Sequence, residues 1–167
     1  MKKTISQTGG AMFLLIALLL PWNRCYAGYP ASTIADSLKK NANAVVREYL
    51  IDYTYQTPTS NRLKHRRVIT VLNKNGDTEA VFSEYYDKFR KFNSLVINLY
   101  DGDGNLIRKV KPSEIRDLQG SEDYDLYSDI RYKYFKPLVS VYPYTVEIDF
   151  EIDILGRITI FIQYFAA

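Results

Sequence analysis

The sequence offers few side chains that could act as a nucleophile or a general base. His65 is the only histidine, and Cys25 is the only cysteine. A Ser-His-Asp or Cys-His site would have to use His65, but no neighbouring residue marks a nucleophile held beside it. A zinc site built from histidines and cysteines needs more of these ligands than the chain has. We therefore predict no catalytic residue, no cofactor and no metal.

One acidic segment resembles the start of a calcium-binding loop. It reads Asp101-Gly102-Asp103-Gly104-Asn105, with oxygen ligands at alternate positions. A calcium loop needs glycine at its sixth position, where this chain has Leu106, and glutamate at its twelfth, where it has Pro112. The segment is therefore interpreted as a hairpin turn.

Basic side chains form two clusters that could bind a phosphate or an acidic surface. The first consists of Arg62, Lys64, His65, Arg66 and Arg67, and the second of Lys88, Arg90 and Lys91. On a strand, Arg62, Lys64 and Arg66 would point to one side, and His65 and Arg67 to the other. A solvated, charged sheet edge that discourages aggregation is the favoured interpretation.

Tyrosines and acids form two further candidate groups. The chain has 15 tyrosines, and the clustered ones are Tyr85, Tyr86, Tyr124, Tyr127, Tyr132, Tyr134, Tyr142 and Tyr144. An exposed tyrosine surface could stack on sugars or bind a protein, although tyrosine also suits a half-exposed sheet face, which is the favoured interpretation. Asp117, Glu122, Asp123, Asp125 and Asp129 could gather a metal, but we expect a solvated acidic loop.

Hydrophobic periodicity predicts a short helix followed by strands. Ser32 is the expected N-cap of a helix over Thr33–Ala42. From Val45 onward the period changes to two, which predicts strands over 45–55, 63–72, 78–86, 94–100, 106–110, 126–135 and 144–154. Asn75-Gly76 is the expected tight hairpin turn after the second strand, and residues 87–93 form a basic loop. A single helical turn capped by Ser113 is expected over 112–117.

The strand over 144–154 has the clearest alternation. Tyr144, Val146, Ile148, Phe150, Ile152 and Ile154 share one face, and Thr145, Glu147, Asp149, Glu151 and Asp153 share the other. A shift of one residue would move four carboxylates into the core, so the register is strongly determined. Strands joined by hairpins, without long helices between them, favour a mainly β fold, an antiparallel β-sandwich-like domain with a short N-terminal helix.

The first 27 residues resemble a signal peptide. Lys2 and Lys3 are followed by an apolar run over 11–20 and by Cys25-Tyr26-Ala27, with small residues where a signal peptidase reads. The run is too short for an ordinary membrane span. We expect cleavage after Ala27 and export to the periplasm or cell envelope, with no membrane span afterwards. An uncleaved anchor and a lipid on Cys25 are the alternatives.

Cleavage would change the charge of the chain. The full sequence has 22 Lys+Arg and 19 Asp+Glu, and Lys2, Lys3 and Arg24 precede the cleavage point while no acid does. The remaining chain has 19 of each sign, so the basic pI of the full sequence gives no reason to expect nucleic-acid binding. We divide it into a lead-in and helix (28–43), an antiparallel β domain (44–155) and an apolar tail (156–167).

The order of motifs resembles a bacterial family of domains of unknown function, found N-terminal to transglutaminase-like domains in exported proteins. The matching segments, from about Tyr29 to Asp153, are Ala44-Val45-Val46, 67–73 with Gly76, 96–100 with Asp103-Gly104, Lys109-Val110, 113–117, 126–129, Pro137 and 142–147. The resemblance implies a β-sandwich-like fold and no established activity.

The chain departs from that family at its end and in its chemistry. Family members continue past the last strand, whereas residues 156–167 are strongly apolar and could add one strand or result from truncation. A transglutaminase-like site needs a cysteine, which the exported chain would lack. We expect a non-catalytic binding or accessory domain with a protein or glycan partner in the envelope. The alternatives are a fragment without independent function and, less favoured, a hydrolase or metal-dependent enzyme.

Overall fold

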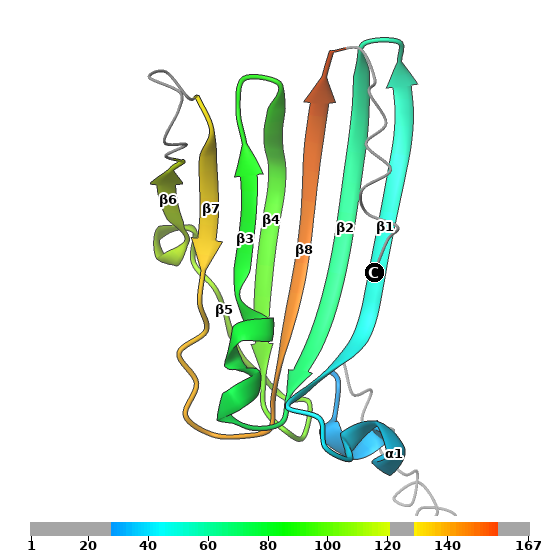
Figure 1. The fold of residues 1–167 in the computed structure, drawn as a ribbon, viewed down its shortest axis with the longest axis vertical. Helices are drawn as coiled ribbons and strands as arrows, with labels where there is room; N and C mark the ends of the chain where they lie inside the picture. Colours follow the sequence, from blue (N-terminus) through cyan, green and yellow to red (C-terminus); the bar gives the residue numbers. More distant parts are fainter. Residues whose placement is uncertain (1–27, 121–128, 157–167) are drawn as a thin grey trace, which may run out of the picture.

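Two antiparallel β-sheets form the fold, as the mainly β prediction requires (Figure 1). The computed structural model describes residues 28–120 and 129–156. The predicted signal peptide, the tail over 157–167, and the candidate residues Glu122, Asp123, Tyr124, Asp125 and Tyr127 lie outside the described residues.

Eight strands, one α-helix and three short 3₁₀-helices make up the described part of the chain. In chain order they are η1 (Ala31–Thr33), α1 (Asp36–Lys39), β1 (Ala44–Thr57), β2 (Ser60–Val71), η2 (Lys74–Ala80), β3 (Phe82–Tyr86), β4 (Arg90–Tyr100), β5 (Leu106–Lys109), η3 (Pro112–Glu114), β6 (Arg116–Gln119), β7 (Arg131–Phe135) and β8 (Tyr144–Leu155).

The larger sheet has the strand order β1-β2-β8-β4-β5. β8 therefore lies in the centre, between β2 and β4, although it is the last strand in sequence. β2 also has a neighbour on each side. The prediction that its basic cluster marks a sheet edge is thus wrong, because hydrophobic alternation shows which side a residue faces and not which strand lies beside it.

The smaller sheet has the order β3-β7-β6. The predicted tight hairpin at Asn75-Gly76 is wrong. The side chain of Asn73 accepts a hydrogen bond from the Asn75 amide at 3.0 Å, which caps η2 instead. After η2 the chain enters β3, which pairs with β7 and not with β2. β6 was not predicted, because its four residues are too few for a pattern to stand out.

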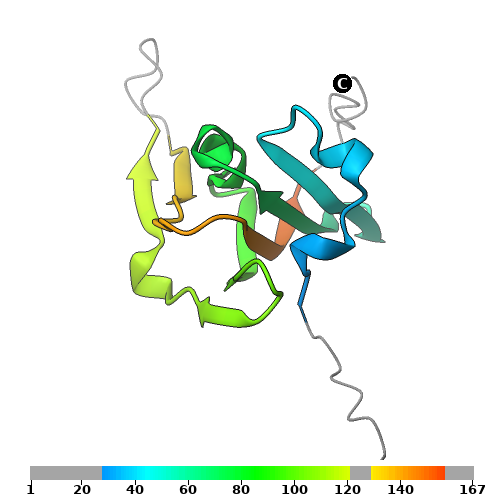
Figure 2. The ribbon, with the colours of Figure 1, turned by 90° about the horizontal axis from the view of Figure 1, so that it is seen from below.

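Short helical segments differ from their predicted limits and caps. α1 has four residues, and Asn41 in the left-handed region (φ 63°) turns the chain out of the predicted helix. The prediction that Ser32 caps the first helix is wrong, because Ala35 is the residue that precedes α1. The prediction that Ser113 caps the later turn is also wrong, because the Glu114 side chain accepts from the Lys111 amide at 2.9 Å at the start of η3. Figure 2 shows α1 and η2 at the same end of the strands.

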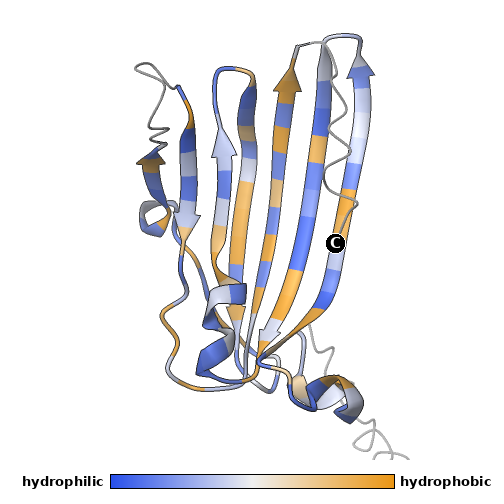
Figure 3. Cartoon of the chain, in the orientation of Figure 1, coloured by the Kyte–Doolittle hydropathy of each residue, from blue (hydrophilic) through white to orange (hydrophobic). Residues whose placement is uncertain are grey.

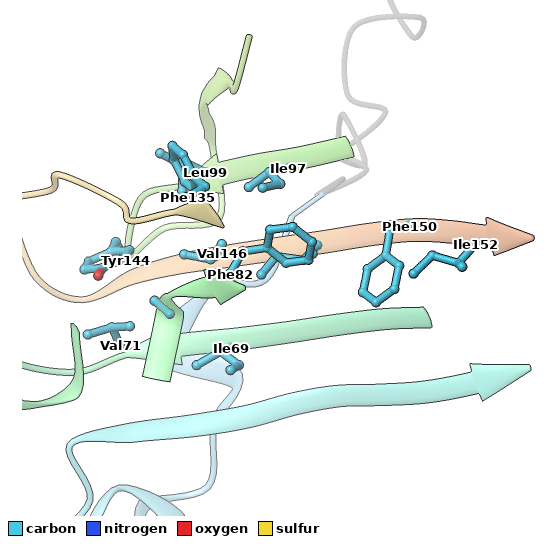
Figure 4. Packing of buried hydrophobic residues seen from close by; sticks show 12 residues of the cluster. Ile69, Val71, Phe82, Ile97, Leu99, Phe135, Tyr144, Val146, Phe150 and Ile152 are labelled. Atoms are coloured by element: carbon cyan, nitrogen blue, oxygen red, sulfur yellow. The ribbon is translucent and has the colours of Figure 1, made fainter. Parts of the chain in front are cut away.

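The core lies between the two sheets. Along β8, apolar and polar residues alternate as predicted (Figure 3), and the apolar ones face the smaller sheet. Phe82 of β3 packs against Phe150 of β8, with ring centroids 5.5 Å apart. Figure 4 shows Phe82 beside Val146, and Phe135 of β7 beside Leu99. This packing leaves the other face of the larger sheet for polar side chains.

In the described residues, we find no helix that is both long enough and apolar enough to span a membrane.

Candidate functional site

The polar face of the larger sheet carries a ladder of ion pairs between β2 and β8. We call this surface, formed by β1, β2, β8 and β4 on the side away from the core, the charged face. The register sets Arg62 opposite Asp153, Lys64 opposite Glu151 and Arg66 opposite Asp149. The corresponding N–O distances are 2.8, 3.1 and 2.7 Å. Opposite charges directly across neighbouring strands support this register.

Glu147 is the buried centre of the charged face. Its carboxylate accepts hydrogen bonds from Asn98 Nδ2 (2.8 Å), from the Tyr100 hydroxyl and from Arg66. Burial raises the pKa of Glu147, but these donors and the charge of Arg66 outweigh it, so that its pKa lies below the ordinary value. Burial and the bond to Glu147 in turn raise the pKa of Tyr100 to about 12. Glu147 is therefore held as a charged structural acceptor.

The lead-in segment covers one end of this face. The Tyr29 hydroxyl donates to Glu48 Oε2 at 2.7 Å and accepts from Arg66 Nη2 at 2.8 Å. Its ring lies edge-on to that of Tyr100, with centroids 6.3 Å apart. Arg47 holds the same segment by donating to the Pro30 carbonyl at 3.2 Å. The lead-in is thus fastened to β1, β2 and β4.

Beside the lead-in, the charged face is hollowed. The hollow has a volume of about 280 Å³. Leu50 of β1 and Val96 of β4 contribute exposed apolar side chains to it. Its remaining lining is mostly polar: Asp52, Lys64, His65, Arg66, Ser94, Asp149, Phe150 and Glu151. The hollow thus places two apolar side chains beside paired charges of both signs.

The ring of His65 points away from the charged face, so it is not placed to act as a base in the hollow. It lies on the core side of β2, edge-on to the rings of Tyr49 (4.8 Å) and Phe150 (5.0 Å). Burial and then the nearby charge of Arg67 lower its pKa to about 4. The predicted separation of Arg62, Lys64 and Arg66 from His65 and Arg67 is confirmed by the register. His65 therefore serves as a neutral packing residue.

The calcium-like segment forms the predicted hairpin turn between β4 and β5. The Asp101 carboxylate accepts from the backbone amides of Asp103 (3.0 Å) and Asn105 (2.8 Å). Gly104 has φ 84°, a left-handed conformation that favours glycine. The side chain of Asn105 also donates to this carboxylate. That bond, followed by the backbone bonds, lowers the pKa of Asp101. The Asp101 carboxylate thus serves as the acceptor that closes the turn.

Among the predicted acidic residues, Asp117 joins the smaller sheet and Asp129 lies apart from it. Asp117 accepts from Lys133 (2.7 Å), from the Tyr86 hydroxyl (2.6 Å) and from Arg131 (2.8 Å), which together lower its pKa to about 2. Asp129 lies 4.0 Å from Lys88. Within residues 28–120 and 129–156, no cluster of three or more His, Cys, Asp or Glu could hold a metal ion.

The second basic cluster and the described tyrosines are distributed over separate contacts. Arg90 pairs with Glu84 at 2.7 Å and lies 4.1 Å from the centre of the Tyr85 ring. Tyr142 and Tyr144 donate instead to Asp77 at the far end of the molecule. The described tyrosines therefore do not form one flat platform, since these two groups belong to different ends of the strands.

Sequence reasoning did not identify the hollow. Its walls come from β1 and β4, which are 46 positions apart at Leu50 and Val96 and are brought into one sheet by β2 and β8. The alternation in β8 predicted a polar face, but no local pattern indicates which apolar side chains would border it. Leu50 lies between Tyr49 and Ile51, and Val96 between Leu95 and Ile97, so nothing in the local sequence sets either residue apart.

Comparison with known proteins identifies one family and one similar fold. The model of the DUF3857 family, a domain of unknown function with a solved structure, matches residues 58–166. A crystal structure from Parabacteroides distasonis ATCC 8503, described as that of a "putative protease", superposes with a TM-score of 0.59 at 12% identity. The match covers 68% of this chain and 23% of that one, and at this identity it shows the fold alone. No curated protein matches the sequence.

Proposed function

This chain belongs to the DUF3857 family of domains of unknown function, and we propose that it is an exported, non-catalytic domain that binds another protein through the charged face. The observation that carries the proposal is the hollow beside Leu50 and Val96. It combines exposed apolar side chains with paired charges of both signs, a composition that suits a protein partner.

A non-catalytic role is supported by the contacts of the side chains that could act as an acid or a base. His65 packs between two aromatic rings, and Glu147 and Asp117 each accept from three side-chain donors. A general acid or base needs a proton that it can exchange with a substrate. Side chains with these contacts are better suited to holding strands together.

A protein partner is favoured over a glycan by the lining of the hollow. Sugar-binding sites commonly use an exposed aromatic ring as a stacking platform. The aromatic lining residue here is Phe150, which is buried in the core, while the exposed apolar residues are aliphatic. Leu50 and Val96 could instead contact apolar side chains of a protein, with Lys64 and Glu151 at the polar rim.

An accessory role beside a second domain is supported by the comparisons and by the resemblance. The part of this chain that matches the Parabacteroides structure corresponds to 23% of that structure. The sequence motifs resemble modules that precede transglutaminase-like domains in exported proteins. We propose that the partner protein carries a domain of this kind. The apolar run over 11–20 and the small residues before Gly28 support export with cleavage after Ala27.

Site-specific photo-crosslinking in cells that export the chain tests this function. A photoreactive phenylalanine replaces Leu50 or Val96, and Ile107 on β5 is the control, because it is equally apolar and half exposed. We expect Leu50 and Val96 to yield the same discrete protein adduct, identified by mass spectrometry, and Ile107 to yield none. Equal adducts from all three positions, or none from the first two, would contradict the proposal.

The same sample tests export. N-terminal sequencing of the purified protein should begin at Gly28. A chain that begins at Met1, or that carries a lipid on Cys25, would contradict cleavage after Ala27 but would leave the binding result valid.

A further inference from the structure

An apolar stripe remains exposed on the opposite, core-side face of the β1–β2 hairpin. Tyr49, Ile51, Tyr53 and Tyr55 of β1 lie on this face, because their partners in β2 are Arg67, His65, Leu63 and Asn61. The smaller sheet covers β8 and β4, where Phe82 meets Phe150 and Phe92. The stripe on β1 stays open: Tyr53 is 46% exposed and Tyr55 58%.

Asn61, beside this stripe, has a polar side chain that the described residues leave without a partner. It lies opposite Tyr55 in β1 and Ile154 in β8, and its exposed fraction is 0%. Neither Oδ1 nor Nδ2 of its amide has a hydrogen-bond partner among the described residues. A buried amide without partners costs free energy, so such groups are almost always satisfied in folded proteins. The side chain of Asn61 therefore points to a polar group that pairs with it.

The chain itself leaves β8 at this place. Gly156 follows the last residue of β8 and donates its backbone N–H to the carbonyl of Thr59 at 2.9 Å. Thr59 lies in the turn between β1 and β2, next to the start of β2. Gly156 has φ 115°, a conformation that only glycine adopts easily and that redirects the chain after the strand. Gly156, the last described residue, thus lies beside the turn that joins β1 to β2.

The composition of this segment matches the stripe. Ile158, Ile160 and Ile162 alternate with Thr159, Phe161 and Gln163, and Arg157 is its one charged residue. Eleven residues can reach up to about 35 Å when extended, whereas the seven strand positions from Tyr49 to Tyr55 span roughly 20 Å. The segment is therefore long enough to cover the stripe from the hairpin turn to Tyr49.

We infer that residues 157–167 dock on the core-side face of the β1–β2 hairpin, with their apolar side chains against Tyr49, Ile51, Tyr53 and Tyr55 and a polar group paired with Asn61. This inference does not depend on the proposed function, which uses the opposite face of the same sheet. It assigns an intramolecular partner to the exposed stripe in place of a second copy or another protein.

Photo-crosslinking in the purified full chain tests the docking. A photoreactive phenylalanine replaces Tyr53, and Leu50 on the opposite face of β1 is the matched control. Trypsin places both positions in the same peptide, Glu48–Arg62, and releases the end of the chain as Ile158–Ala167. We expect position 53 to link these two peptides severalfold more than position 50 does.

A mixture of ¹⁴N- and ¹⁵N-labelled protein distinguishes the occupants. Adducts between peptides of one label support docking within the chain. Mixed-label adducts, which would indicate a second copy, or the absence of a link from position 53 would overturn it. Failure of the Leu50 and Val96 adducts in cells would instead contradict the proposed function alone.

Hydrogen exchange provides a second readout with charge-matched variants. Ile158→Asp with Ile160→Asp should accelerate amide exchange in the peptide Glu48–Arg62, because the carboxylates would oppose docking on an apolar face. Thr159→Asp with Gln163→Asp adds the same charge at the alternate positions and should leave the exchange nearly unchanged. Equal exchange in the two double variants would overturn the inferred orientation of the segment.

Discussion

At the scale of single residues, the register gives neighbouring side chains of one strand different environments. Lys64 and Arg66 pair with acids on the charged face, while His65 between them packs against Tyr49 and Phe150. Neutral imidazole suits that surrounding, since burial disfavours the charged form.

His65 makes the stability of the fold dependent on pH. Its pKa is lowered from 6.5 to about 4 in the folded chain, so the unfolded chain binds a proton more readily. The stabilisation from neutral His65 is thus present above pH 6.5 and is lost as the pH falls towards 4. Urea unfolding at about pH 7.5 and about pH 5 should show a smaller loss for His65→Phe than for the unmodified chain.

The control for this comparison is Tyr53→Phe, which removes a hydroxyl from the same face of the β1–β2 hairpin and keeps the imidazole. It should lose as much stability in acid as the unmodified chain. If His65→Phe lost just as much, the pH dependence would come from the carboxylates and not from His65.

At this scale, the sequence alone predicted which residues share a side, but not what they contact. The separation of Arg62, Lys64 and Arg66 from His65 follows directly from the two-residue period of a strand. Their partners Asp153, Glu151 and Asp149 lie more than 80 positions away. No local property of β2 identifies them.

At the scale of elements, η2 shows how one side chain can replace a predicted turn. Asn73 starts the helix, and Asp77 within it accepts from the hydroxyls of Tyr142 (2.8 Å) and Tyr144 (2.9 Å). Burial and the bond to Asp77 raise the pKa of Tyr144 above its ordinary value. The helix is thereby joined to the start of β8.

Asp77→Asn should weaken this junction. An amide has one acceptor oxygen where the carboxylate has two, and it lacks the charge that strengthens both bonds. We expect the free energy of unfolding to fall by about 1–2 kcal/mol in urea denaturation. The control Glu79→Gln changes an exposed carboxylate in the same helix and should cost less than about 0.5 kcal/mol. Equal losses would show that Asp77 has no special role.

At the scale of the whole molecule, Glu147 joins parts that are distant in sequence. Through Arg66, Asn98 and Tyr100 it connects β2 and β4 to β8, and through Arg66 and Tyr29 it reaches the lead-in. These contacts link the first described residues to the last strand.

Glu147→Gln should therefore affect the entire fold. The neutral amide would leave Arg66 with fewer acceptors and place an NH₂ group beside the Asn98 and Tyr100 donors. We expect a loss of about 2–3 kcal/mol in the free energy of unfolding. Glu151→Gln is the control, since this acid makes a more exposed pair with Lys64 and should cost less than about 1 kcal/mol. Similar losses in both variants would contradict a central role for Glu147.

The sequence by itself determined the β class, the polar and apolar faces of β8 and the hairpin at Asp101–Asn105. These features depend on local periodicity and on turn residues, which act within a few positions. Only the tertiary structure decided that β2 is a central strand, that β3 pairs with β7, and that Leu50 and Val96 border one hollow. Alternation sets the side on which a residue lies, whereas strand neighbours are chosen by packing between segments far apart in the chain.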